Sequence, residues 1–242
     1  MPDLKHRAKI SPASMAVIVP AAGSGRRFGD RRNKLFAILD GKPLWMHSIL
    51  TLSSNQVVGR IVLAVAPTDE PTFSEQAAQL NVPIAVDIVL GGEERLDSVN
   101  AALSHVVEKD AIRWVAVHDA ARPLVSAEDL DRVFAKAAES GAAILAEPVA
   151  STVKRTRNGG VSCETLDRSE LWLAQTPQVF RKDILARAYE RHRGRHATDD
   201  AELVSRGGVN VAIVAGSTSN LKITFPSDLA IAESILQQRQ QA

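Results

Sequence analysis

The sequence predicts an α/β fold: a doubly wound, mostly parallel, Rossmann-like sheet with helices on both faces. Apolar runs alternate with helical patterns along most of the 242 residues, an order that is typical of parallel sheets. The composition agrees, because 45% of the residues are hydrophobic but only 4% are aromatic, which suits aliphatic strands covered by helices. Right-handed crossovers would place the loops that follow the strands along one edge, where ligands of such sheets bind.

Apolar runs in the first two thirds of the chain predict its strands. They lie at 15–19, 35–39, 61–66, 84–90, 114–117 and 142–146, the second closed by the Asp40-Gly41-Lys42-Pro43 turn. Helices are expected between them, from Pro43 to about Ser53, from Asp69 or Thr72 onward, up to about Val107, and after Ser126. Ser126 is a good helix cap because Asp129 stands three residues later, at the capping-box position.

The alternation stops at residues 149–171, which are rich in Thr, Arg, Ser and Asn. Asn158-Gly159 within this stretch predicts a hairpin turn. A polar two-stranded hairpin is marginal on its own in water, so we expect this protruding β-hairpin arm to pack on something else. A second subunit is one candidate.

After the arm the α/β pattern resumes and reaches the end of the chain. We expect an apolar run at 171–174, a helix at 182–191, strands at 209–214 and 221–224, and a final helix from about Pro226. Residues 1–14 are polar and charged and are expected to form a flexible tail. Residues 15–242 are then expected to form a single domain, with 149–171 as its arm.

Charge and cysteine content exclude several classes of protein. The formal net charge is +1, so no overall basic field points to nucleic acid. Cys163 is the only cysteine, which excludes an intrachain disulfide and cysteine-based zinc sites and favours a reducing compartment. Neither a signal peptide nor an apolar run of membrane-spanning length is present. We therefore expect a cytoplasmic protein that binds neither nucleic acid nor membrane.

A glycine-rich loop follows the first expected strand directly, from Pro20 to Gly29. Its glycines allow a ligand close to the backbone, where successive N–H groups can bind an anion. Nearby cations could stabilise charge on a triphosphate; they are Arg26, Arg27, Arg31 or Arg32, and Lys34. The P-loop string is absent, and Phe28 occupies the third glycine position of the dinucleotide fingerprint. The alternative is a surface turn with solvated arginines.

Further polar motifs fall at the same predicted edge. Gly91-Gly92-Glu93-Glu94-Arg95-Leu96-Asp97-Ser98 opens a helix, whose N-terminus could receive a base or phosphate or could simply be capped by its own polar residues. In His118-Asp119-Ala120-Ala121-Arg122-Pro123, the aspartate could hold a hydroxyl and the arginine a phosphate, or the two could form an ion pair. His118 itself is interpreted as structural. Weaker candidates are Thr152, Lys154, Arg155 and Arg168 in the arm, Thr198, and Lys222 in an otherwise apolar strand.

Taken together, these motifs resemble one family. The strings are Pro20-Ala-Ala-Gly-Ser-Gly-Arg-Arg27 with Lys34, Gly91 to Ser98, Val117 to Pro123, Leu171-Trp through Thr176-Pro-Gln178, Ala197-Thr-Asp199 and Asn220-Leu-Lys222. Their order and spacing resemble the 2-C-methyl-D-erythritol 4-phosphate cytidylyltransferase family from about Met15 onward. The resemblance implies a nucleotidyltransferase domain that joins CTP to methylerythritol phosphate and releases pyrophosphate, in the non-mevalonate isoprenoid pathway.

The resemblance also implies roles for individual residues. Four would act in catalysis: Arg27 and Lys34 on the α-phosphate, and Arg168 and Lys222 in aiming the acceptor phosphate. Contacts to CTP would come from Ala21, Ala22, Gly23, Gly25, Gly92, Glu93 and Ser98. Contacts to the acceptor would come from Asp119, Arg122, Thr152 and Thr198. No protein metal ligand is implied, because Mg²⁺ would be held mainly by the CTP phosphates. The arm would cross a homodimer, so that Thr152 and Arg168 serve the partner's site.

Two alternatives share much of this pattern. Ribitol 5-phosphate cytidylyltransferase has the same loop and strand-end aspartate motif, and substrate choice depends on few contacts. A non-catalytic nucleotide-binding regulator could use the same scaffold, although a mere binder has no need of both Arg27 and Lys34.

Overall fold

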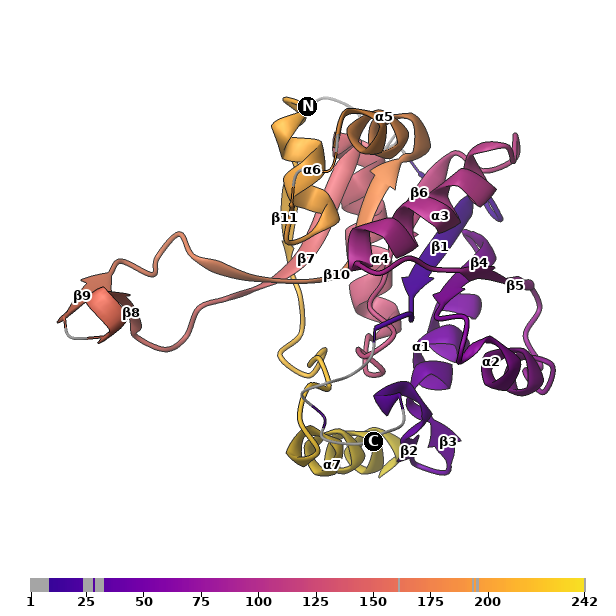
Figure 1. The fold of residues 1–242 in the computed structure, drawn as a ribbon, viewed down its shortest axis with the longest axis horizontal. Coiled ribbons are helices and arrows are strands. Elements are labelled where there is room, and N and C mark those ends of the chain that lie inside the picture. Colours follow the sequence, from indigo (N-terminus) through magenta and orange to yellow (C-terminus); the bar gives the residue numbers. More distant parts are fainter. Residues whose placement is uncertain are drawn as a thin grey trace, which may run out of the picture.

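A mostly parallel sheet forms the centre of the molecule (Figure 1). The computed structural model describes residues 9–23, 28, 33–160, 162–192, 194 and 196–241. Within these residues the sheet has seven strands in the order β11-β7-β10-β6-β1-β4-β5. Their bounds are β1 Met15–Pro20, β4 Val58–Val65, β5 Ala85–Leu90, β6 Trp114–Val117, β7 Ala142–Pro148, β10 Trp172–Arg181 and β11 Ala212–Ala215. Only β10 among them runs antiparallel to its neighbours, β6 and β7. The predicted fold class is confirmed.

Helices cover both faces of this sheet. They are α1 Leu44–Ser53, α2 Glu70–Ala77, α3 Arg95–Val107, α4 Ala127–Ser140, α5 Lys182–His192, α6 Asp200–Arg206 and α7 Ser227–Gln241. Side chains of β1 alternate between two cores: Met15 and Val17 pack with α1 and α4, and Ile18 packs with α3 and α5. Because both faces are buried, the strand is apolar at every position rather than at every second one.

Helix α4 shows how local sequence sets an element. The Ser126 side chain accepts a hydrogen bond from the Asp129 N–H at 3.1 Å, which satisfies a donor that the first turn leaves unpaired. At the other end Gly141 takes a φ of +83°, a left-handed conformation that favours glycine. Both ends therefore follow from the sequence, and the predicted cap is confirmed.

One predicted strand is shorter than expected and another is absent. Residues 35–39 begin as a 3-10 helix, η2 Lys34–Phe36, and only β2 Ile38–Leu39 pairs, with β3 Lys42–Pro43. The Asn33 side chain accepts from the Leu35 N–H and so starts the helical turn. Residues 221–224 lie in no sheet, because the Ile223 N–H donates to Ala121 in a loop rather than to a strand. The strand predicted at 209–214 forms at Ala212–Ala215, and helix α6 had no prediction.

The predicted arm is present as a hairpin that projects away from the sheet (Figure 1). Strands β8 Val153–Arg157 and β9 Ser162–Leu166 are antiparallel and are joined by η3 Asn158–Gly160. Across the pair, Arg155 and Glu164 form an ion pair of 2.5 Å. At the stem, Trp172 and Leu173 are 39% and 56% exposed. The hairpin is confirmed, and its role in dimerisation stays a prediction. None of the described helices is long and apolar enough to cross a membrane.

Candidate active site

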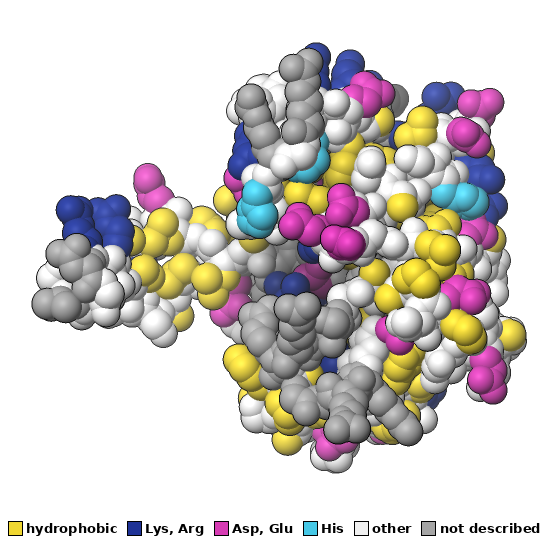
Figure 2. Space-filling view, viewed as in Figure 1, with side chains coloured by type: hydrophobic (Ala, Val, Ile, Leu, Met, Phe, Trp, Pro, Cys, Tyr) yellow, Lys and Arg dark blue, Asp and Glu magenta, His cyan; other side chains and the backbone are white. Residues whose placement is uncertain are grey.

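A cleft of about 550 Å³ opens at the carboxyl edge of the sheet. Figure 2 shows a hollow in the middle of this face with charged side chains inside it. The cleft is formed by residues that follow β1, β5 and β6 and by the segment near Lys222. It brings together nine of the predicted site residues, namely Ala21, Ala22, Gly23, Lys34, Gly92, Glu93, Ser98, Asp119 and Lys222. Gly25 and Arg27 lie outside the described residues.

A smaller cavity of about 210 Å³ shares a wall with this cleft. Arg95, Asp119 and Lys222 line both. Two further predicted residues, Arg122 and Thr198, line only the smaller cavity. The Thr198 backbone N–H and hydroxyl both donate to Glu202, at 2.7 and 2.9 Å. The site therefore consists of two adjoining spaces whose shared wall is formed by Asp119 and two of its cationic neighbours, Arg95 and Lys222.

Lys34 is held beside the first part of the glycine loop. The Asn33 amide donates to the Ala21 carbonyl at 3.3 Å and to Asp69 at 2.9 Å, and so ties the turn that carries Lys34 to the end of β1. The Lys34 ammonium donates to the Ile223 carbonyl at 2.6 Å across the cleft. The positive charge of Lys34 therefore lies between the end of β1 and the segment at Ile223, which are far apart in the sequence.

The segment before α3 combines helix capping with an open backbone. The Asp97 carboxylate accepts from the Glu94 N–H at 3.1 Å, and the Glu94 side chain completes a capping box. A Cβ on Gly92 would collide with the Asp97 Cβ, so only glycine fits there. Ser98 is buried, and its hydroxyl lies 3.2 Å from the Gly92 nitrogen. Capping thus engages Glu94 and Asp97, while Gly92, Glu93 and Glu94 line the cleft.

Asp119 forms the charged centre of the site. Its carboxylate lies 2.8 Å from the Lys222 ammonium, 3.4 Å from Arg95 and 3.7 Å from Arg122. Burial by itself would raise the pKa of Asp119, but Lys222 and Arg95 outweigh it and hold that pKa well below its usual range. The ion-pair alternative raised from the sequence is therefore present, and it includes two more cations than the sequence suggested.

Arg122 is largely committed to the protein's own backbone. Its guanidinium donates to the Asn220 carbonyl at 2.6 Å and to the Ala174 carbonyl at 3.3 Å. The side chain is only 11% exposed. Arg122 therefore fastens three segments of the wall of the smaller cavity, and little of it faces solvent.

Arg95 is a site residue that the sequence analysis did not identify, and it lines both cavities. It donates to Asp200 at 2.7 Å, and the Tyr189 hydroxyl donates to the other oxygen of Asp200 at 2.5 Å. Burial would lower the pKa of Arg95, but Asp200 and Asp119 outweigh burial and raise it. Its place at the first position of α3, among acidic residues, was the signal that could have identified it.

Thr152 and Arg168 do not reach the cleft of their own chain. Both lie in the arm region and are exposed. Arg168 donates to the Ala150 carbonyl, which fastens it to the neighbouring segment of the arm's stem. Lys154 and Arg155 likewise make cross-strand contacts with Thr165 and Glu164 within the arm.

His118 is fully buried behind Asp119. Burial lowers the pKa of His118 to about 4, although the nearby Asp119 carboxylate acts in the opposite direction. An unfolded histidine has a pKa of about 6.5. Between these values the unfolded chain binds a proton that the folded chain does not, so stability falls as the pH falls.

We therefore expect the free energy of unfolding to decrease by about 3 kcal/mol between pH 6.5 and pH 4 through His118 alone. Urea denaturation across this range measures the decrease. His47 is half-buried with a lowered pKa and adds in the same direction, so the informative quantity is the difference between the unaltered chain and His118→Phe. If the free energy of unfolding fell equally with pH in the two proteins, the interpretation of His118 would be contradicted.

The described residues include no group of three or more His, Cys, Asp or Glu side chains that could hold a metal ion. The acidic residue at the centre of the site, Asp119, is instead surrounded by cationic side chains.

Comparisons with known proteins agree with one another. The family model of 2-C-methyl-D-erythritol 4-phosphate cytidylyltransferase matches residues 15–238. A relative of that description from Rhodopirellula baltica is 54% identical over 233 residues, covering 93% of this chain and 95% of its own. The crystal structure from Francisella tularensis superposes with a TM-score of 0.77 at 32% identity, over 91% of this chain and 99% of the other. That from Thermus thermophilus has a TM-score of 0.74 at 30% identity, over 92% and 98%.

Proposed function

The chain belongs to the 2-C-methyl-D-erythritol 4-phosphate cytidylyltransferase family, and from this premise we propose how its cleft performs the reaction. The enzyme joins CTP and 2-C-methyl-D-erythritol 4-phosphate to give 4-diphosphocytidyl-2-C-methyl-D-erythritol and pyrophosphate, in non-mevalonate isoprenoid biosynthesis. A phosphate oxygen of the acceptor forms a bond to the α-phosphorus of CTP. The bond from that phosphorus to the bridging oxygen of the β-phosphate breaks, and pyrophosphate leaves with the electron pair.

This reaction needs no general base, because the attacking oxygen is already anionic. The task is to bring two anions together in line, which positioning and fixed cations achieve. We assign the stabilisation of charge at the α-phosphate to Lys34 and Arg27. The position of Lys34 at the meeting point of the glycine loop and the Ile223 segment supports this assignment.

The larger cavity suits the nucleotide and the smaller one the acceptor. We assign CTP contacts to Ala21, Ala22, Gly23, Gly25, Gly92, Glu93 and Ser98. We assign acceptor contacts to Asp119, Arg122, Thr198 and Lys222, together with Thr152 and Arg168 of a partner subunit. Lys222 has a side chain that is 41% exposed beside an 11% exposed Asp119, so its ammonium is open to a phosphate while the carboxylate holds it in place.

We propose that Mg²⁺ accompanies CTP and is held mainly by its phosphate oxygens. When bound, the ion offsets part of the negative charge on the triphosphate. The cationic surroundings of Asp119 support this arrangement over a cage of protein carboxylates. An exposed lone Cys163 suits a reducing compartment, and we propose a cytoplasmic location.

The single observation that carries the proposal is the Asp119–Lys222 pair, which lines both cavities, the larger of which is also lined by Lys34. Pyrophosphate release from the purified protein tests it. We expect turnover with CTP, Mg²⁺ and methylerythritol phosphate, and much slower turnover with ATP, GTP or UTP. Ribitol 5-phosphate is the matched acceptor control. Equal or faster turnover of ribitol 5-phosphate would reject the assigned acceptor, and nucleotide binding without pyrophosphate release would point to a regulator.

We further propose a homodimer in which the arm of each subunit completes the partner's site. The exposed position of Thr152 and Arg168, away from their own cleft, supports this arrangement. In a mixed dimer of Lys34→Ala and Arg168→Ala chains, one of the two sites would have both residues intact.

We expect each variant alone to be nearly inactive and the mixture, after subunit exchange, to regain activity. As the control, each inactive variant is taken alone through the same subunit-exchange conditions. Activity that never exceeds the sum of the separate variants would show that Arg168 serves its own chain, or that the arm does not cross a dimer. Native mass spectrometry measures the oligomeric state in the same samples.

A further inference from the structure

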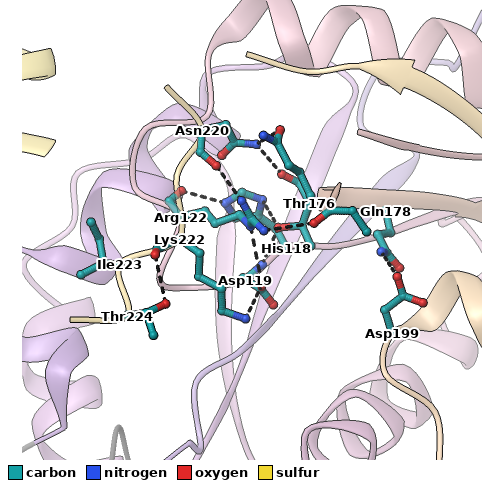
Figure 3. Close-up of polar contacts among 12 residues, drawn as sticks. His118, Asp119, Arg122, Thr176, Gln178, Asp199, Asn220, Lys222, Ile223 and Thr224 are labelled. Atoms are coloured by element: carbon teal, nitrogen blue, oxygen red, sulfur yellow. Dashed lines mark hydrogen bonds and ion pairs between the residues drawn. The ribbon is translucent and has the colours of Figure 1, made fainter. Parts of the chain in front are cut away.

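Hydrogen bonds connect the His118 ring directly to two chain segments that line the smaller cavity and, through Arg122, to a third (Figure 3). These segments are residues 118–122, 174–178 and 220–224. His118 Nε2 lies 3.1 Å from the Arg122 carbonyl oxygen, and Nδ1 lies 3.2 Å from the Thr176 hydroxyl. The same hydroxyl lies 2.9 Å from the Asp119 backbone nitrogen. The ring thus stands between the backbones of two proposed acceptor-binding residues.

The contacts fix which nitrogen carries the proton. A carbonyl oxygen can only accept, so Nε2 must be the N–H that donates to Arg122. A neutral ring then has a bare Nδ1, which must accept the proton of the Thr176 hydroxyl. That hydroxyl in turn accepts from the Asp119 N–H, so each group has a suitable partner. Burial, which lowers the pKa of His118 to about 4, favours the neutral ring that this pattern requires.

The chain of bonds continues and closes on itself. The Arg122 guanidinium donates to the Asn220 carbonyl at 2.6 Å, and the Asn220 amide donates to the Thr176 carbonyl at 2.9 Å. Asn220 stands two residues before Lys222, whose ammonium meets the Asp119 side chain at 2.8 Å. A change at His118 would therefore reach Asp119, Arg122 and Lys222 together.

We propose that His118, held as the neutral Nε2–H tautomer, is a positioning residue for the acceptor. It sets the distance between the Asp119 and Arg122 backbones and, through Thr176 and Asn220, the place of Lys222. It touches no substrate and exchanges no proton in the reaction. The inference deepens the proposed function by assigning this role within the acceptor subsite, and it rests on that function for the identity of the acceptor.

Replacing the His118 imidazole with a phenyl ring keeps a ring in the buried site and removes the ring's hydrogen bonds. The variant therefore separates the positioning role of these bonds from the packing role of the ring. In His118→Phe, the Thr176 hydroxyl loses its acceptor and is free to rotate, while Ser48 still donates to the Arg122 carbonyl at 3.0 Å. We expect KM for methylerythritol phosphate to rise about tenfold or more, as for the loss of one buried hydrogen bond. KM for CTP should stay within about twofold, because no CTP contact changes.

The matched control is His47→Phe. His47 Nε2 also lies at hydrogen-bond distance from a carbonyl, that of Leu39 at 2.7 Å, but lies away from both cavities. The His47→Phe variant should have a lower melting temperature but unchanged KM values for CTP and for methylerythritol phosphate. Equal increases in both KM values for His118→Phe, or no increase, would overturn the proposal.

Thr176 variants test the same chain of bonds if His118→Phe does not fold. Thr176→Val removes the hydroxyl and should raise the acceptor KM, whereas Thr176→Ser keeps it and should restore the unaltered value. The double variant Thr176→Val with His118→Phe should raise the acceptor KM little more than either change alone. Both changes break the same hydrogen bond, the one between His118 and the Thr176 hydroxyl. Additive losses would show that the two residues act separately.

Nitrogen NMR of the unaltered protein measures the tautomer directly at pH 7. A protonated Nε2 and a bare Nδ1 on His118 are expected, and the opposite tautomer or a doubly protonated ring would overturn the proposal. This measurement needs no turnover. A protein that showed the expected tautomer but released no pyrophosphate would contradict the proposed function alone.

Discussion

Replacement of Lys34 by alanine is expected to lower kcat by about a hundredfold or more, the usual cost of removing one preorganised group that stabilises charge in a transition state. Lys34 lines the proposed nucleotide cleft and donates across it to the Ile223 carbonyl. The affinity for CTP should fall much less, because backbone groups at Ala21 to Gly23 and Gly92 would still hold the nucleotide. Steady-state kinetics and CTP titration of the same preparation separate the two effects.

Lys42→Ala is a suitable control for Lys34→Ala. Lys42 is an exposed lysine in β3 and does not line the cleft. Its replacement removes the same charge from the molecule without changing the site, so kcat should remain that of the unaltered enzyme. A Lys34→Ala enzyme with unchanged kcat would remove the proposed role of this residue, and loss of CTP binding without loss of kcat would make it a ground-state contact.

Asp119→Asn is expected to cost about 3 kcal/mol of unfolding free energy at pH 7 and to raise KM for the acceptor. The change leaves the charges of Arg95, Arg122 and Lys222 without the carboxylate that they surround, and removal of one partner from a buried ion-pair network is strongly destabilising. Lys222 would also lose the group that holds it beside the smaller cavity. Urea denaturation and acceptor kinetics measure the two effects.

The pH dependence of the stability lost in Asp119→Asn shows whether the loss comes from the carboxylate charge or from a change in side-chain packing. The pKa of folded Asp119 lies well below the unfolded value of about 3.9. Its stabilisation is therefore full above about pH 5 and is lost as the pH falls from about 4 through the folded pKa. The stability difference between the unaltered chain and the Asp119→Asn variant should follow that course. Asp183→Asn, which changes two exposed ion pairs, with Arg181 and Arg187, should alter stability by less than about 1 kcal/mol.

The fold and much of the site could be predicted because both follow from local pattern and sheet topology. Apolar runs that end in glycine or aspartate place Gly92 and Asp119 after parallel strands, and the carboxyl ends of such strands meet at one edge. The Ser126 cap and the Asn158-Gly159 turn likewise depend only on nearby residues.

Contacts between distant segments could not be predicted in this way. Lys222 was expected in a strand, but its segment bonds to the loop at Ala121, and nothing in this short, largely apolar stretch distinguishes these partners. The pairing of Arg95 with Asp200 joins residues 105 positions apart in the chain. The Asn33 bridge to Asp69 depends on where α2 begins. Such partners are set by tertiary packing, which no local periodicity encodes.

The central claim is that the acceptor's phosphate oxygen attacks the α-phosphorus of CTP within this cleft. The most direct test uses methylerythritol phosphate with ¹⁸O in its non-bridging phosphate oxygens, followed by phosphorus NMR of both products. We predict one labelled oxygen between the two phosphorus atoms of the cytidine product and no label in pyrophosphate. Label in the released pyrophosphate, or an unlabelled bridge in the product, would contradict the account.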